Sequence, residues 1–334
     1  MEEKIQETIH TLESQFTGDE AHDLEIVRHY LGTLDRTEAN IPLVKALGAY
    51  CVQKFPNSEI VQSAKQIEEA FDYFHSRVRE AQTCLKEKKY EDAVAIYREI
   101  IGKSKVERSD GDVLKFAFTH PFEEMIYRMD TEETRKIERI SALPVLLYYE
   151  LGIALFELQR YDEAKEAYNA ALALNPVNPL PHYELIQIAK LTGDLDSIRE
   201  ILAKVHRYLF TRPQLARFYR EQAQLAIFEE KYDLAVTLVY ISMDYDDCGQ
   251  ARAQLNALAK HKGTDLSRPK ANDAKARLEA EKIPVGPYAP IYESAMQIGA
   301  QTRQKYPEIA KMAYGIAYDL THFKPIGDIL AQMG

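Results

Sequence analysis

A five-residue pattern recurs at constant spacing along this chain of 334 residues. It reads KYEDA at 89–93, RYDEA at 160–164 and KYDLA at 231–235, and the closing alanine returns after 71 residues both times. A constant spacing over three copies indicates an internal structural repeat. Such a unit cannot bury its apolar face alone, so neighbouring copies must stack to form one continuous core.

The second copy lies between two segments with helical periodicity. Small and apolar residues recur there at steps of three and four, which places them on one face of each helix. They are Tyr148, Leu151, Gly152 and Leu155 in the first segment, and Ala164, Tyr168 and Ala171 in the second. The small residues allow the helix axes to approach to about 8–10 Å. Because the turn at 159–162 is short and Pro176 ends the second helix, the two segments form an antiparallel hairpin.

The spacing from Tyr148 to Pro176 resembles the tetratricopeptide repeat, a helix-turn-helix unit of about 34 residues. Two such periods fit into each interval of the pattern. We therefore expect a divergent hairpin at 179–210, and an insertion at 105–141 within the first interval. The resemblance implies an all-α fold, a right-handed superhelix (α-solenoid) of stacked antiparallel hairpins with divergent end repeats.

Three regions are expected along the chain. Residues 1–73 form an N-terminal helical cap that is weakly repeat-like, residues 74–246 carry the repeats and the insertion, and residues 247–334 form divergent helical repeats with a capping helix. In the last region Ile298-Gly299 occupies the place of Leu151-Gly152. The segment 283–290 has three prolines and a glycine, which excludes a helix or a central strand.

The insertion is expected to hold two helices. Pro121 suits the first turn of one helix, and Asp130 with Glu133 resembles a capping box for a second helix. Insertions in solenoids often carry function, but this one could equally be a structural spacer. Both interpretations stay open.

Charge and composition exclude some classes of partner. The net charge of −10 and the pI of about 5.5 argue against nucleic acid or an anionic membrane, because both require a basic surface. Three dispersed cysteines without a CxxC pair indicate small buried residues in a reducing compartment. The sequence shows no signal region and no apolar run of about 18 residues, so we expect a cytoplasmic protein.

The resemblance also implies a binding surface. In tetratricopeptide proteins the first helix of each hairpin lines a concave groove that takes extended peptides or partner helices. The residues predicted to bind there are Leu146, Tyr149, Ile153, Phe156, Tyr183, Gln187, Arg217, Arg220 and Gln224. That groove would be apolar at one end and basic at the other, where Arg217 and Arg220 would select acidic character. Alternatively, the apolar members belong to the core or are covered by the insertion.

One branch of the family binds the C-terminal carboxylates of chaperones through a clamp of lysines, asparagines and an arginine. The corresponding positions here are Tyr149, Ile153, Glu184, Arg217 and Glu221. Only Arg217 matches, and the two glutamates would repel a carboxylate. We therefore do not expect this chain to bind chaperone tails.

The sequence offers little for catalysis. It contains no HExxH, CxxC, GxSxG or phosphate-loop motif. The nearest group of suitable side chains is His120, Glu123, Glu124 and Asp130 in the insertion, which could hold a metal but is typical of a solvated polar turn. We predict a non-enzymatic scaffold that binds a protein or peptide and needs no cofactor. The alternatives are a peptide-sensing regulator, or an enzyme or metal site in the insertion; the partner and the oligomeric state are left open.

Overall fold

The computed structural model describes residues 2–33, 41–56, 58–104, 109, 111–261 and 265–333. Two compact units divide the chain, Met1–Glu80 and Ala81–Gly334, and the division falls within helix α4 (Glu59–Lys86). The first residues of the predicted insertion, 105–108 and 110, lie outside the described residues.

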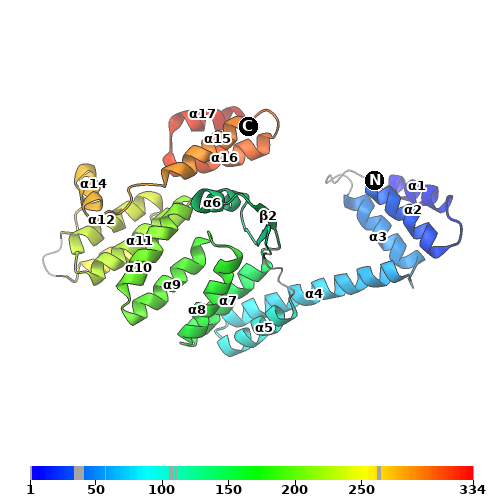
Figure 1. Cartoon of the computed structure of the whole chain (residues 1–334), viewed down its shortest axis with the longest axis horizontal. Coiled ribbons are helices and arrows are strands. Elements are labelled where there is room, and N and C mark those ends of the chain that lie inside the picture. The colour runs from blue at the N-terminus through cyan, green and yellow to red at the C-terminus, as the bar shows by residue number, and fades with distance from the viewer. Residues whose placement is uncertain are drawn as a thin grey trace. The chain divides into compact units, whose positions relative to one another are not determined.

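The N-terminal unit is helical, as Figure 1 shows. Before α4 it contains α1 (Glu2–Glu13), α2 (Glu20–Thr33) and α3 (Ile41–Lys54). Its core is small and contains Leu12, Val27, Leu43 and Leu47. Asp23 is buried and accepts hydrogen bonds from the backbone N–H of Thr17 at 2.7 Å and of Gly18 at 3.0 Å, which holds the chain between α1 and α2.

Helical hairpins stacked side by side build most of the second unit (Figure 1). They contain α5 (Tyr90–Lys103), α7 (Leu143–Glu157), α8 (Tyr161–Leu174), α9 (Pro179–Thr192), α10 (Leu195–Val205), α11 (Arg212–Phe228) and α12 (Tyr232–Tyr245). A 3-10 helix, η2 (His206–Tyr208), links α10 to α11. Helix α5 packs against α7, and from α7 to α12 each helix packs against the next. The predicted α-solenoid, including the divergent hairpin at 179–210, is confirmed.

A bare glycine backbone allows α7 and α8 to pack closely. A Cβ atom on Gly152 would lie 2.4 Å from a ring carbon of Tyr168, a distance that no real contact tolerates. The same arrangement returns between α15 (Ala289–Thr302) and α16 (Pro307–Thr321), where a Cβ on Gly299 would lie 2.8 Å from the Tyr314 ring. The C-terminal hairpin therefore repeats the packing of the central one, as expected from Ile298-Gly299.

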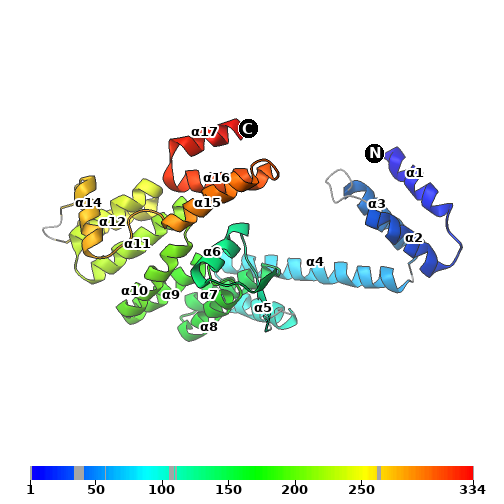
Figure 2. The same ribbon diagram turned by 45° about the horizontal axis from the view of Figure 1, so that its top comes forward.

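The C-terminal part contains three further helices. They are α13 (Gly249–Leu258), α14 (Ala271–Ala280) and α17 (Lys324–Met333). Figure 2 shows α15 and α16 as an antiparallel pair with α17 beside α16. The proline-rich segment before α15 is irregular, as predicted, yet it is held firmly. The Tyr219 hydroxyl accepts from the Gly286 N–H at 2.7 Å and donates to the Pro284 carbonyl at 3.0 Å.

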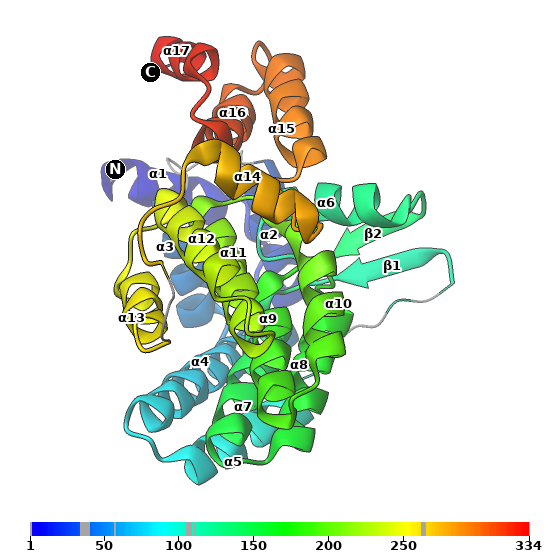
Figure 3. The ribbon, with the colours of Figure 1, turned by 90° about the vertical axis from the view of Figure 1, so that its left-hand side faces the viewer.

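The insertion departs from the all-α prediction. It contains β1 (Val113–Phe116), α6 (Pro121–Thr131) and β2 (Lys136–Arg139), and the two strands pair in parallel with α6 as the crossover (Figure 3). The helix predicted at Pro121 is confirmed. The prediction of a second helix is wrong. Asp130 lies within α6, and its carboxylate accepts from the Tyr208 hydroxyl at 2.8 Å instead of capping a new helix.

The insertion is built into the solenoid. The Ala117 N–H donates to the carbonyl of Leu174 at the end of α8 at 2.8 Å. Phe118 and Phe122 are buried in the same core cluster as Phe210, which precedes α11. Both polar and apolar contacts therefore fix α6 against the hairpins.

We predict that Gly152→Ala lowers the free energy of unfolding by about 1–3 kcal/mol, because the added methyl group must displace the Tyr168 ring. Urea unfolding followed by circular dichroism measures this change. The matched control is Gly315→Ala in α16, where no atom lies within 4 Å of the new methyl group. That variant should gain roughly 0.5–1 kcal/mol from helix propensity. Equal effects of the two substitutions would contradict the close-packing argument.

His182 in α9 makes the stability depend on pH. The side chain is 4% exposed, and its Nε2 donates to the Pro176 carbonyl at 3.2 Å. Burial lowers the pKa of His182 to about 4, and the nearby Lys204 adds to the effect. The unfolded chain binds a proton at this residue near pH 6.5, whereas the folded chain does not until about pH 4. Folding is therefore favoured above pH 6.5 and loses this contribution as the pH falls towards 4.

Between pH 6.5 and 4, the wild type should lose about 1.4 kcal/mol more per pH unit than His182→Gln, which corresponds to one proton. Urea unfolding of both proteins across this range measures the difference. Other titrating groups are common to the two proteins and cancel. Parallel stability curves would contradict the assignment.

Candidate functional site

A cleft of about 520 Å³ opens where α6, α7, α9 and α11 begin. It lies between the insertion and the first helices of two successive hairpins, the face predicted to bind a partner. Its lining residues are Thr119, His120, Glu123, Ala142, Leu143, Val145, Leu146, Tyr149, Asn178, Pro179, Leu180, Phe210 and Gln214.

Capping residues fix where three of these helices begin. His120 Nδ1 accepts from the Phe122 N–H at 3.1 Å at the start of α6, and Asn178 Oδ1 accepts from the Leu180 N–H at 3.0 Å at the start of α9. At the start of α11, Gln214 Oε1 accepts from the N–H groups of Phe210 at 2.9 Å and Thr211 at 3.1 Å. His120 and Asn178 satisfy backbone donors of the first helical turn, whereas Gln214 reaches back to the N–H groups of the N-cap and of the residue before it.

Glu123 closes the polar end of the cleft. It is 3% exposed, and its carboxylate accepts from the Thr119 N–H at 2.6 Å, the His120 N–H at 3.1 Å and Asn175 Nδ2 at 2.9 Å. These bonds hold the Glu123 carboxylate against the start of α6, where His120 Nδ1 is engaged in the cap. Among the described residues, no group of three or more His, Cys, Asp or Glu side chains is placed to hold a metal ion.

The walls of the cleft are apolar and open to solvent. Leu146 on α7 is 38% exposed and Leu180 on α9 is 42% exposed, although both are large apolar side chains. Leu143 and Phe210 continue the apolar lining. Adjoining apolar side chains left open in this way are typical of a surface that binds a partner.

The four residues predicted on α7 follow one line along the helix. Leu146 and Tyr149 line the cleft, while Ile153 and Phe156 lie farther along and are half-buried. The Phe156 ring packs against Tyr161, with ring centroids 5.5 Å apart. Burial, and then the nearby Glu184 carboxylate, raise the pKa of Tyr149 to about 12, so its hydroxyl stays protonated.

Two cations at the predicted basic end of the groove are paired with carboxylates. Arg217 pairs with Glu184 at 2.9 Å and lies 3.9 Å from Glu221. Glu221 also accepts from Gln187 at 3.1 Å and pairs with Lys190. Arg217 and Lys190 are thus committed to carboxylates of the same surface.

Two predicted binding residues are buried. Tyr183 is 1% exposed, because the Arg217 guanidinium covers its ring at 4.4 Å from the centroid. Arg220 is 8% exposed. Neither side chain is offered to a partner, whereas Gln187 and Gln224 remain half-buried on this surface.

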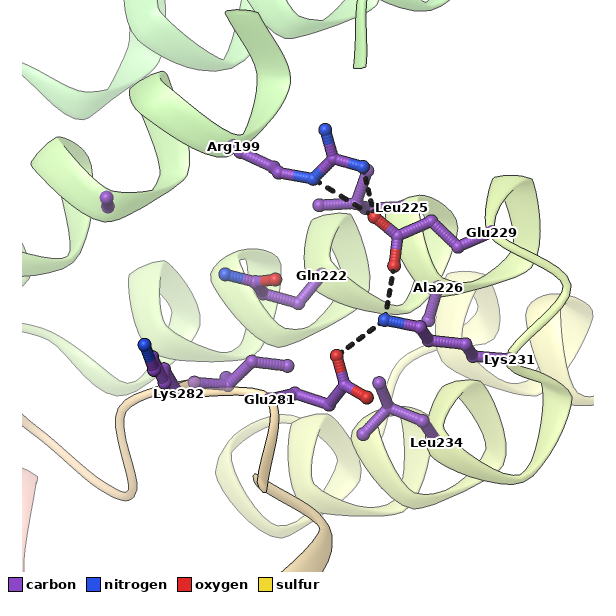
Figure 4. A pocket seen from close by; sticks show the side chains of 11 residues that line it. Arg199, Gln222, Leu225, Ala226, Glu229, Lys231, Leu234, Glu281 and Lys282 are labelled. Carbon is purple, nitrogen blue, oxygen red and sulfur yellow. Dashed lines mark hydrogen bonds and ion pairs between the residues drawn. The ribbon is translucent and has the colours of Figure 1, made fainter. Parts of the chain in front are cut away.

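Another hollow, of about 240 Å³, lies beside α10, α11 and α12 (Figure 4). Four of its charged side chains form one network. Glu229 accepts from Arg199 at 3.1 Å and pairs with Lys231 at 2.9 Å, and Lys231 pairs with Glu281 at 2.5 Å. This network fastens the end of α14 to the turn before α12, so we assign the hollow a structural role.

The family comparison supports a helical repeat in the central part of the chain. Residues 145–178 match the family model of the tetratricopeptide repeat. This segment is a tetratricopeptide repeat. The matched repeat comprises α7, α8 and the turn that leads into α9, and α7 forms one wall of the cleft.

A comparison with curated proteins found no match. Among solved structures, one similar chain belongs to the crystal structure of the APC/C hetero-tetramer Cut9–Hcn1, with 11% sequence identity and a TM-score of 0.33. The alignment covers 94% of this chain and 60% of that chain. We draw no conclusion about partners from so distant a likeness. In the described part of the chain, no helix combines the length and the apolar character that crossing a bilayer requires.

Several lining residues were not predicted from the repeat pattern. The capping residues His120, Asn178 and Gln214 lie outside the positions that line a groove in tetratricopeptide repeats. Their sequence signal was a helix start, since a proline adjoins each cap within the first helical turn. Nothing in the sequence indicated that these helix starts meet at one cleft.

Substitutions at His120 measure how much its helix cap contributes to folding stability. His120→Ala should cost about 1 kcal/mol of folding stability, because the Phe122 N–H loses its acceptor. His120→Asn should restore most of that loss, since an asparagine oxygen caps as well as the imidazole nitrogen does. Urea unfolding of the three proteins provides the measurement. If Asn destabilises as much as Ala, the cap is not the stabilising contact.

Proposed function

We propose that this protein is a non-enzymatic interaction scaffold, and that the cleft between the insertion and α7 and α9 binds an extended peptide segment of a partner protein. The observation that carries this proposal is the cleft itself, with Leu146 and Leu180 half-open on its walls. A tetratricopeptide repeat is a fold for binding other proteins, and this cleft lies on the first helix of the matched repeat.

The dimensions of the cleft support a peptide as its occupant. Its volume of about 520 Å³ lies within the usual range of binding pockets, roughly 300–1,000 Å³. Helix starts fixed by caps surround it, so binding requires little ordering of the scaffold. A site formed in advance keeps more of its contact energy as affinity.

The surface beyond the cleft extends the proposed site along α7, α9 and α11. Ile153 and Phe156 would continue the apolar contact, and Gln187, Arg217 and Gln224 would form a polar rim. Because Arg217 is already paired, we assign it to positioning and not to the selection of acidic segments. The three cysteines are unpaired, in keeping with the reducing cytoplasm that we propose as the location.

Leu146→Glu tests the site. A peptide selected from a random dodecamer display library on the wild-type chain should bind this variant at least 10-fold more weakly, because a carboxylate replaces an apolar wall. Isothermal titration calorimetry with the isolated peptide gives the two dissociation constants.

Leu191→Glu is the matched control. Leu191 lies on α9 and is 56% exposed, but it is not part of the cleft lining. This substitution adds the same charge and should leave the affinity within twofold. Equal weakening by both variants, or none by Leu146→Glu, would place peptide binding outside the cleft and overturn the proposal.

A further inference from the structure

At the polar end of the cleft, side chains that cap helices also face the space where a ligand would bind. Three of them, His120, Asn178 and Gln214, have an acceptor atom that a helix start already uses. Their N–H groups remain to meet a ligand. We propose, on the basis of the proposed function, that this cleft selects a neutral peptide segment through hydrogen bonds to its main-chain carbonyl groups.

Asn178 provides the strongest observation. The residue is 8% exposed and lines the cleft, and its Oδ1 accepts from the Leu180 N–H. Among the described residues, its Nδ2 has no hydrogen-bond partner. The Nδ2 atom is not among the fully buried atoms without a partner, so this mostly buried side chain presents its amide donors to the cleft. A carbonyl oxygen in the cleft would supply the missing acceptor.

Gln214 and His120, like Asn178, use an acceptor atom in a helix cap and leave an N–H group for a ligand. Gln214 Oε1 accepts two backbone N–H groups, and its Nε2 has no partner among the residues that the structure describes. His120 Nδ1 accepts from the Phe122 N–H, so the neutral ring carries its proton on Nε2. Burial lowers the pKa of His120, which favours this neutral form. Each side chain can donate to a ligand while keeping its cap.

The charges around the cleft favour a neutral acceptor over an anion. None of the described lining residues is a lysine or an arginine, and the buried Glu123 contributes a negative charge. The ends of α6, α7, α9 and α11 that face the cleft are their N-termini, which carry partial positive charge. These helix ends would stabilise a carboxylate as well as a carbonyl dipole, so discrimination against an anion rests on Glu123 and on the lack of a lysine or arginine among the described lining residues. A carboxylate would lack a cation to pair with and would lie in the same cleft as Glu123.

Apolar contact completes the recognition. Leu143, Leu146 and Leu180 lie on the walls of the same cleft. A peptide that places a carbonyl group at the donors can direct an apolar side chain towards these leucines. The cleft is thus matched to an aliphatic residue with an amide, and not a free carboxylate, on its C-terminal side.

Two small probes test this chemistry on the full chain. N-acetylleucinamide and N-acetylleucine share the side chain and the acetyl group, and differ only in an amide against a carboxylate. Leucine methyl groups observed by NMR report binding at Leu143, Leu146 and Leu180. We expect N-acetylleucinamide to shift these signals at millimolar concentration and N-acetylleucine to bind at least threefold more weakly.

Asn178→Asp and Gln214→Glu remove one donor each and keep the capping oxygen. Aspartate and glutamate in the first turn also suit the helix dipole, so the melting temperature should not fall. Each variant should raise the dissociation constant of N-acetylleucinamide about 10-fold. Asn169→Asp, at an exposed position of α8 outside the cleft lining, adds the same negative charge as a control and should have no effect.

Three results would overturn the inference. They are tighter binding of N-acetylleucine than of N-acetylleucinamide, unchanged affinity in both donor variants, and no shift of the cleft leucines by N-acetylleucinamide. None of these results depends on the Leu146→Glu comparison. A selected peptide that still requires Leu146 would preserve the proposed function while this account of its selectivity fails.

Discussion

The contact between the Tyr168 ring and the bare backbone of Gly152 sets how closely α7 and α8 pack. Because a solenoid is built by adding each helix onto the previous one, an error at this contact would pass to every later helix. The start of α9 would then move relative to the start of α7, and the two walls of the cleft would no longer face each other. The second use of the same contact, between Gly299 and Tyr314, shows that this chain relies on one packing solution in distant parts of its sequence.

Much of the helical fold could be predicted because its determinants are local. Steps of three and four residues, a short turn and a terminating proline define the hairpin of α7 and α8 without reference to the rest of the chain. Strand β2 had no such local signal. Its four residues are held by pairing with β1, more than twenty residues earlier in the chain, so tertiary contact overrides the local pattern. Likewise, Asp130 resembles a cap locally, but its hydroxyl partner Tyr208 is 78 residues away.

The candidate site shows the same division between local and distant determinants. Helical periodicity was enough to place Leu146 and Tyr149 on the face that lines the cleft. The burial of Tyr183 could not be deduced from α9 alone, because the cover is a guanidinium from α11. The repeat pattern also gave no sign that the insertion forms one wall of the cleft. The position of that wall depends on a backbone hydrogen bond from Ala117 to Leu174.

The attachment of the insertion has a mechanical consequence. Superhelical repeat arrays behave as springs, because each unit touches only its neighbours and small rotations accumulate along the array. Here α6 and its strands bind the end of α8 through Ala117 and also bind η2, two helices later, through Asp130. These two attachments connect elements that are not neighbours in the array. The insertion should therefore restrict bending and twisting between α8 and η2, next to the cleft. Hairpins without such attachments remain freer to deform.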